Sequence, residues 1–284
     1  MSQPHDMERR LTRRLAHDRC EPMSTDDFLA RFGAEGQRQP DPVAAAQSAM
    51  RNALPKRFYE AAGVVARDGL FHVALDGRTA RTPARNPLAV TSEPVAHALA
   101  AEWQAQAERI DPARMPLTRL VNSALDGVAD QQEPVRAEIV RYAGSDALCY
   151  RAGEPEALVA LQDEIWEPIR HAVEATIGAR FVLAEGIVFT QQPADTLAAV
   201  TRHVGAIPAP LALAGAHNVM TLTGSTILML ALVFGHRDAD AGWAAAHLDE
   251  DYQIGIWGQD EEAAERRAIR RTEFDAAVLL LTQG

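Results

Sequence analysis

The sequence predicts an α+β fold, in which a small antiparallel β-rich domain with a covering helix is followed by a larger all-α helical domain. Between residues 56 and 115, short β-rich runs are separated by Asp-Gly steps, which supply the positive φ that tight hairpins need. Beyond Pro116, apolar residues recur at helical spacing almost throughout. The 284 residues are 47% hydrophobic, enough for one large core or two smaller ones.

The predicted small domain covers residues 56–115 and has strands at 58–66, 70–75 and 88–90. Asp-Gly steps at 68–69 and 76–77 mark its turns. Ser92 then offers an N-cap, and Leu99 and Trp103 follow at helical spacing. We expect this helix to cover one face of the sheet.

The predicted helical domain covers residues 116–284. Its helices are expected at 117–130, 134–143, 155–177, 196–204, 210–222, 225–234, 240–253 and 260–281, with possible short strands at 148–151 and 180–189. The stretch 222–234 is apolar on all sides, so it should lie in the middle of the others. At 13 residues it is shorter than the roughly 20 needed to cross a membrane. Residues 1–55 show little apolar periodicity and are expected to be a mobile extension.

The composition argues against several classes of function. Asp and Glu number 39 against 28 Lys and Arg, and the net charge of −11 repels nucleic acid and anionic membranes. The sole lysine, Lys56, does not follow a glycine-rich turn, which excludes ATP hydrolysis by a Walker A loop. Cys20 and Cys149 lack metal-ligand spacing, and the grouping of His236, Asp238 and Asp240 is interpreted as a solvated loop. We therefore expect no cofactor and no metal.

The compartment is predicted from the same counts. The two cysteines fit a reducing environment, and one lysine beside 27 arginines fits the codon bias of a GC-rich bacterial genome. The arginine-rich start of the chain resembles a mitochondrial transit peptide, but its acidic residues oppose that interpretation. The sequence therefore favours the bacterial cytoplasm, with the mitochondrial matrix as the alternative.

An acid-rich segment near the end of the sequence is the main candidate for a binding surface. Residues 238–265 contain nine acidic side chains and no lysine or arginine. On a helical wheel of residues 240–254, the apolar stripe comprises Ala241, Ala244, Ala245, Leu248 and Tyr252, and the opposite face comprises Trp243, Ala246, Glu250, Gln253 and Ile254. An acidic residue among exposed apolar side chains is typical of a protein interface. Alternatively, the helix packs between neighbours and Glu250 pairs with an arginine such as Arg266 or Arg267.

An ordered set of motifs resembles a known family. The motifs are Lys56-Arg57-Phe58-Tyr59, Leu75-Asp76-Gly77-Arg78 with Thr82-Pro83, Glu102-Trp103 with Gln106, Met115-Pro116-Leu117-Thr118, Asp146-Ala147-Leu148-Cys149-Tyr150-Arg151, Leu161-Gln162 with Trp166-Glu167-Pro168, Gly224-Ser225, and Leu248-Asp249-Glu250-Asp251-Tyr252-Gln253 with Trp257-Gly258. Together they resemble the assembly chaperones for the α subunit of the F-type ATP synthase, over about residues 56–280.

The resemblance implies a non-enzymatic chaperone that binds the unassembled α subunit, prevents its aggregation and yields it to the β subunit. The expected partner-binding residues are Glu250, Asp249, Asp251, Gln253, Trp243, Ile254 and Trp257. Asp76, Gly77 and Arg78 are weaker candidates, since they are expected to shape a hairpin first. The free protein is expected to be a monomer.

Two other functions remain open from the sequence. A small hydrolase could use carboxylates of the helical domain, and it would need a concave pocket that holds a carboxylate of raised pKa. An interaction module for another basic or apolar partner is the third possibility.

Overall fold

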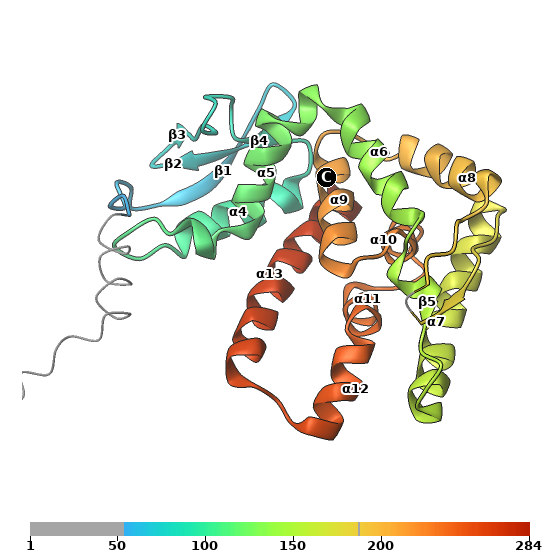
Figure 1. Cartoon of the computed structure of the whole chain (residues 1–284). Helices are drawn as coiled ribbons and strands as arrows, with labels where there is room; N and C mark the ends of the chain where they lie inside the picture. Colours follow the sequence, from blue (N-terminus) through green and yellow to red (C-terminus); the bar gives the residue numbers. More distant parts are fainter. Residues whose placement is uncertain (1–53, 187) are drawn as a thin grey trace, which may run out of the picture. The chain divides into compact units, whose positions relative to one another are not determined.

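The computed structural model describes residues 54–186 and 188–284, and residues 54–284 cluster into one compact unit. All but the last two residues of the predicted extension lie outside the described part. Figure 1 shows a small antiparallel sheet with its covering helix and a larger set of helices, which confirms the predicted α+β class. The domain boundary near residue 115 stays a prediction.

The sheet is built from two Asp-Gly hairpins. Its strands are β1 (Ala62–Arg67), β2 (Leu70–Leu75), β3 (Arg78–Thr79) and β4 (Ala89–Val90). All pairs are antiparallel, with β2 between β1 and β3 and with β4 also paired to β2. Asp76 and Gly77 form one turn with φ of 47° and 78°. The first strand begins later than predicted, because the amides of Glu60 and Ala61 donate to the Asp76 carboxylate.

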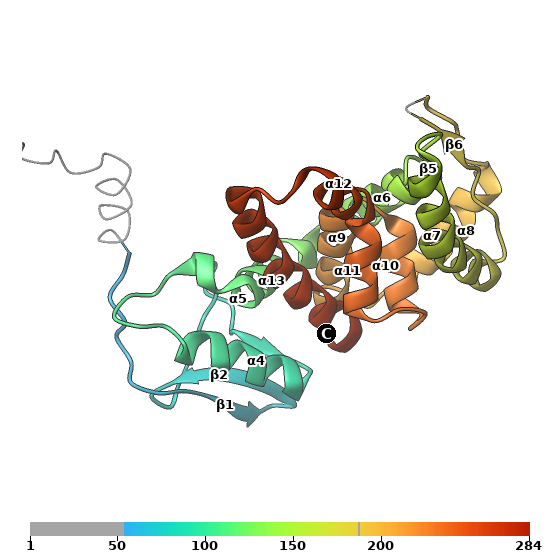
Figure 2. The same cartoon turned by 90° about the horizontal axis from the view of Figure 1, so that it is seen from below.

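Helix α4 (Glu93–Gln104) covers β1 and β2, as Figure 2 shows. Its N-terminus is capped by Ser92, whose hydroxyl oxygen accepts a 3.5 Å hydrogen bond from the amide of Val95. Its other end is held by Arg57, whose guanidinium donates to the carbonyls of Gln104 and Gln106. A cation at these carbonyls complements the negative end of the helix dipole. The predicted covering helix is therefore confirmed.

The helical part surrounds one almost entirely buried helix. Its elements are η1 (Pro112–Arg114), α5 (Pro116–Asp126), η2 (Val128–Asp130), α6 (Gln132–Ala143), η3 (Ala147–Cys149), β5 (Tyr150–Arg151), α7 (Glu156–Ile177), β6 (Ala184–Glu185), α8 (Ala194–Gly205), α9 (Leu211–Thr223), α10 (Thr226–Val233), α11 (Ala239–Ala246), α12 (Leu248–Trp257) and α13 (Glu261–Gln283). Seven of the eight residues of α10 are buried, and α6, α7, α9, α11 and α13 pack around it. The prediction of a central apolar helix holds, and among the described residues no helix is long and apolar enough to cross a membrane.

Several predicted segments differ from the structure. The helix predicted at 117–130 ends at Asp126, and the short helix η2 follows Gly127. The possible strands at 148–151 and 180–189 shorten to β5 and β6, which pair in parallel through Tyr150 and Ala184.

Helix α13 lies against α9 at an unusually short distance. A Cβ atom added to Gly215 would lie 2.6 Å from the amide nitrogen of Leu281 and 2.7 Å from the carbonyl oxygen of Ala277. Only glycine permits this approach of two helix backbones. The contact fixes the end of α13 and thereby the direction in which the rest of that helix extends.

The start of the central helix is fixed by a buried carboxylate. Asp146, which is fully buried, accepts hydrogen bonds from the Ser225 hydroxyl at 2.7 Å, the Ile227 amide at 2.8 Å and the Leu148 amide at 3.0 Å. Loss of solvation nonetheless outweighs these bonds and raises the pKa of Asp146 to about 6. Above that pH a buried charge is held at the N-terminus of α10.

The raised pKa of Asp146 predicts a pH dependence of stability. The folded state binds this proton more tightly than the unfolded state, so the stabilisation is fully present below pH 3.8 and is lost as the pH rises through about 6. The shift corresponds to a loss of about 3 kcal/mol in the free energy of unfolding. Urea unfolding of wild type and Asp146→Asn between pH 4 and 7 measures it. We expect the free energy of unfolding of Asp146→Asn to lack this pH dependence. It should also be lower by about 1–3 kcal/mol, because an amide NH₂ group would face a backbone N–H. If the free energies of unfolding of wild type and variant change in parallel with pH, the assignment is wrong.

Candidate functional site

The acid-rich segment lies on two helices and not on one. Helix α11 begins at Asp238, whose carboxylate caps the Ala241 amide, and ends at Ala246. His247 separates α11 from α12 and is buried. Its Nδ1 donates a hydrogen bond to the Trp243 carbonyl, and the rings of His247 and Trp243 lie 3.8 Å apart. Burial lowers the pKa of His247, which favours the neutral ring at this contact.

The break corrects the predicted outward position of Trp243. Its side chain is 7% exposed and packs against His247 and against Phe274 of α13, with a ring separation of 5.2 Å in the second pair. The helical wheel was wrong because it treated residues 240–254 as continuous. Ala244, expected in the core, is exposed, whereas Ala245 and Leu248 are buried as expected. Trp243 thus belongs to the core and offers no surface to a partner.

The three adjacent acidic residues of α12 have different surroundings. Asp249 accepts a 2.8 Å hydrogen bond from Nε2 of Gln162, which joins α12 to α7. Asp251 forms a two-point ion pair with Arg267 of α13, one arm of which measures 2.9 Å. Glu250 is exposed, and no described residue lies within hydrogen-bond or ion-pair distance of its carboxylate. Asp251 is the hydrogen-bonded partner of Arg267 and, together with the nearby charge of Glu250, raises the pKa of that guanidinium, so Glu250 lies near Arg267 without forming the alternative ion pair.

Apolar side chains next to Glu250 are exposed to solvent. Trp257 is 82% exposed, and its indole N–H donates to Oε1 of Gln253 at 3.1 Å. Ile256 is also exposed and Ile254 is half-buried. We call Glu250, Gln253, Ile254, Ile256 and Trp257 the α12 surface. Large exposed apolar side chains beside a free charge are typical of interaction sites.

A groove of about 570 Å³ runs between α12 and α13 beside this surface. Its lining comprises Asp249, Glu250, Gln253, Ile254, Ala263, Arg266, Arg267 and Arg270. Arg270 donates to the Leu222 carbonyl, and Arg266 pairs with Glu262, so both guanidinium groups have partners within the protein. Figure 1 shows α12 and α13 projecting on the same side of the helices.

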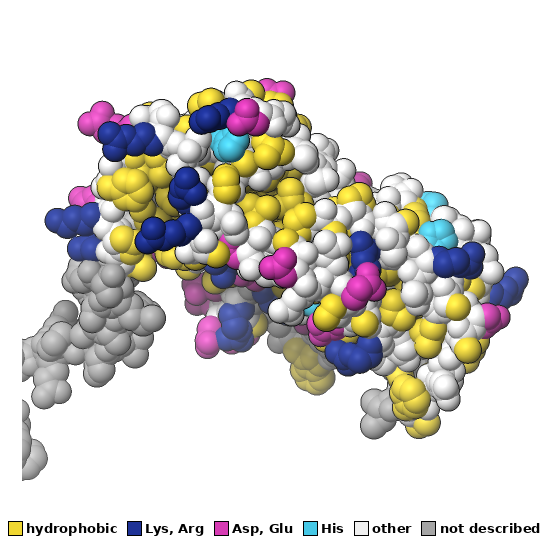
Figure 3. Space-filling model, turned by 90° about the horizontal axis from the view of Figure 1, so that it is seen from above, with side chains coloured by type: hydrophobic (Ala, Val, Ile, Leu, Met, Phe, Trp, Pro, Cys, Tyr) yellow, Lys and Arg dark blue, Asp and Glu magenta, His cyan; other side chains and the backbone are white. Residues whose placement is uncertain are grey.

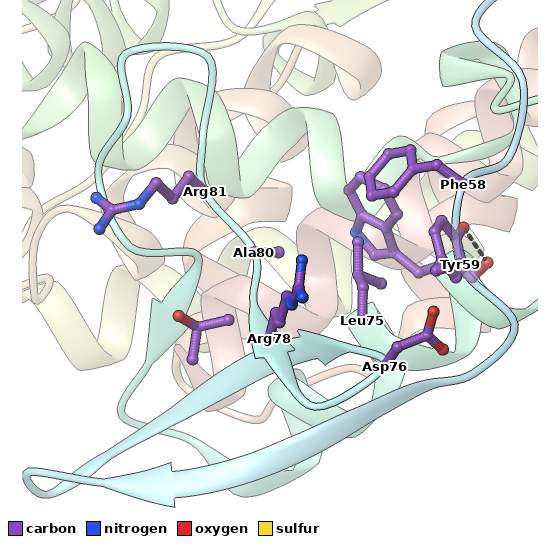
Figure 4. A pocket seen from close by; sticks show the side chains of 9 residues that line it. Phe58, Tyr59, Leu75, Asp76, Arg78, Ala80 and Arg81 are labelled. Atoms are coloured by element: carbon purple, nitrogen blue, oxygen red, sulfur yellow. Dashed lines mark hydrogen bonds between the residues drawn. The ribbon is translucent and has the colours of Figure 1, made fainter.

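The weaker candidates lie at the sheet, where Figure 4 shows a second pocket. Asp76 and Gly77 form the β2–β3 turn, as the hairpin interpretation expects, and the Asp76 carboxylate is turned toward the amides of Glu60 and Ala61. Arg78 instead extends into the pocket, which measures about 580 Å³. Phe58 and Arg81 line the same pocket and were not among the predicted site residues. The adjacent positively charged and aromatic residues at 56–59 are the feature of the sequence that could have indicated this pocket.

Two described carboxyl groups have a raised pKa, and both hold helix N-termini. Asp146 does so for α10. Burial raises the pKa of Glu102, whose oxygens accept 2.8 Å hydrogen bonds from the Leu117 and Thr118 amides at the start of α5. The predicted solvated loop has ordinary partners too, since His236 contacts Thr176 and Asp240 pairs with Arg271. No group of three potential metal ligands occurs in the described part of the chain.

Comparison with known proteins places this fold in a family. Residues 56–174 match the family model described as ATP12 chaperone protein. The crystal structure of Atp12 from Paracoccus denitrificans is 37% identical, with a TM-score of 0.73, and the match covers 80% of this chain and 97% of that one. The chain belongs to the ATP12 chaperone family. The resemblance inferred from the motifs is thus confirmed.

Two further proteins are similar to this chain over most of their length. A candidate chaperone from Agrobacterium tumefaciens is 44% identical, covers 89% of this chain and 95% of its own, and has a TM-score of 0.77. The protein named atp12, mitochondrial, of Schizosaccharomyces pombe is 23% identical over 222 residues, which are 74% of this chain and 76% of the relative. The family model and the Agrobacterium tumefaciens protein are described as chaperones.

The Asp251–Arg267 pair predicts how α12 is held against α13. We expect Asp251→Ala to cost up to about 1 kcal/mol of global stability, because the pair is partly exposed, and to speed hydrogen exchange of the α12 amides. Glu262→Ala is the matched control, because it removes a pair contained within α13. Exchange rates in α12 that respond equally to both variants would show that Asp251 does not anchor this helix.

Proposed function

We propose that this ATP12-family protein is an assembly chaperone of the F-type ATP synthase. In this proposal it binds the unassembled α subunit through the α12 surface, prevents its aggregation and yields it to the β subunit. The observation that carries the proposal is the exposed Glu250 carboxylate, which makes no hydrogen bond or ion pair with a described residue, on the helix that also exposes Ile256 and Trp257. The partner itself comes from the family resemblance.

The geometry of the α12 surface suits a temporary contact. Trp257 supplies a large apolar anchor, and Glu250 supplies a charge that can select a basic group on the α subunit. Asp249 and Asp251 serve chiefly to position the helix, because each is bound to another helix of the chaperone. Such a mixed surface can lose to the more apolar permanent interface that the β subunit offers.

The hydrolase alternative gains no support from the described residues. The two carboxyl groups of raised pKa, Glu102 and Asp146, are each occupied by backbone amides at a helix N-terminus. We further propose that the protein acts in the bacterial cytoplasm, since the bacterial structures are 44% and 37% identical and the yeast protein is 23% identical. The mitochondrial matrix is the alternative.

Charge reversal at Glu250 tests the proposed function. We expect Glu250→Lys to retain the wild-type unfolding curve and to capture the separately expressed α subunit about tenfold less well, which equals about 1.4 kcal/mol. Glu133→Lys is the matched control: Glu133 is 90% exposed and lies in the first turn of α6, which Figure 1 shows at the opposite end of the helices from α12. Capture is measured by pull-down, followed by release on adding the β subunit.

A second variant tests the apolar part of the same surface. Trp257→Ala should weaken capture by a similar factor, because exposed tryptophans that become buried at interfaces often contribute more than 1 kcal/mol. The proposal is wrong if the wild-type protein does not bind the α subunit. If Glu250→Lys and Trp257→Ala capture the α subunit as well as wild type does, the α12 surface is not the binding site.

A further inference from the structure

The sheet end of the protein carries the opposite charge to α12. Residues 54–91 contain six basic and three acidic side chains, in a chain whose net charge is −11. Figure 3 shows hydrophobic side chains on this part of the surface surrounded by Lys and Arg side chains. A local excess of positive charge on an acidic protein favours a locally acidic ligand.

The pocket in this region exists because α4 does not cover the whole sheet. Helix α4 ends at Gln104 and packs against β1, β2 and β4. The open part is lined by Phe58, Tyr59, Leu75, Arg78, Ala80, Arg81 and Trp103, together with Asp76 and Thr79. We call it the arginine-rimmed pocket.

Of the aromatic side chains in the pocket, Tyr59 is held in place and Phe58 is exposed to solvent. The Tyr59 hydroxyl donates a 2.7 Å hydrogen bond to the Trp103 carbonyl, and the two rings lie 5.8 Å apart. Phe58 stands against Tyr59 at 5.3 Å but is 73% exposed. An exposed phenylalanine over an apolar hollow is available to cover an apolar side chain of a ligand.

One cation of the pocket has no partner among the described residues. The Asp76 carboxylate is bound by two backbone amides, and Arg81 donates to the Arg85 carbonyl at 2.8 Å. Arg78 makes no hydrogen bond or ion pair with any described residue, and its side chain points into the hollow in Figure 4. The buried indole N–H of Trp103 has no acceptor among the described residues. A carboxylate on a ligand would give the Arg78 guanidinium an ion-pair partner.

We propose that the arginine-rimmed pocket binds an acidic segment of a partner protein. A carboxylate of the segment pairs with Arg78, and a neighbouring apolar side chain packs against Phe58 and Leu75. A polyphosphate would need several free cations, and of the two arginines that line the described pocket only Arg78 makes no hydrogen bond or ion pair. The identity of the partner as the α subunit rests on the proposed function. The binding of an acidic segment by the pocket does not depend on it.

The first experiment uses peptides, so that it does not depend on the α subunit. Two dodecapeptides share leucines and phenylalanines and differ only by glutamates in one and lysines in the other. The indole N–H signals of the four tryptophans are followed by NMR in the whole protein, with Trp103→Phe to assign the relevant peak. We expect the glutamate peptide to shift the Trp103 signal saturably, and Arg78→Glu to weaken this binding about tenfold.

Three results would overturn the inference. They are equal binding of the two peptides, unchanged binding by Arg78→Glu, and a larger shift with ADP than with the glutamate peptide. Arg67→Glu is the matched control, because Arg67 is exposed and lies at the other end of β1, beside the β1–β2 turn. Thermal unfolding should be unchanged in Arg78→Glu, since no described contact is lost.

The second experiment asks whether the α subunit occupies the pocket. Arg78→Glu should reduce α-subunit capture about fivefold to tenfold, whereas Arg67→Glu should leave it unchanged. Capture by Arg78→Glu equal to that by wild type would remove the α subunit as the occupant. If wild type captures no α subunit, the proposed function fails, and the peptide experiment still decides the chemistry of the pocket.

Discussion

The fold depends on one buried carboxylate that holds two distant segments together. Asp146 binds the start of η3 through the Leu148 amide and the start of α10 through Ser225 and Ile227. Because α10 is buried and other helices pack around it, an error in its position would propagate to α7, α9 and α13. A polar anchor in an apolar interior costs desolvation, but it specifies one register where apolar packing alone would tolerate several.

The parts of the fold that could be predicted from the sequence are those that local chemistry determines. The Asp-Gly steps at 68–69 and 76–77 permit positive φ and place both hairpins. Ser92 caps α4, and the apolar stretch around Leu228 identifies the central helix. The break at His247 could not be predicted this way, because it depends on the packing of Trp243 against Phe274, which is far away in the sequence.

The candidate site shows the same division. The run of acidic residues and the family resemblance predict a binding surface on α12. The sequence does not distinguish the roles of the three consecutive carboxylates. Contacts with Gln162 on α7 and Arg267 on α13 separate them into two that hold the helix and one, Glu250, that is free. The pocket around Arg78 could not be predicted from the sequence, because it depends on where α4 ends over the sheet.

The separation of charge between α12 and the sheet has a consequence for how this protein meets other molecules. A body that is acidic at one end and basic at another has a dipole moment, which exerts an orienting torque in the field of a charged partner before contact. Collisions are then biased toward particular orientations and not sampled evenly. Dissolved ions shorten the range of this bias to about 8 Å at physiological ionic strength, so alignment takes place in the last few water layers.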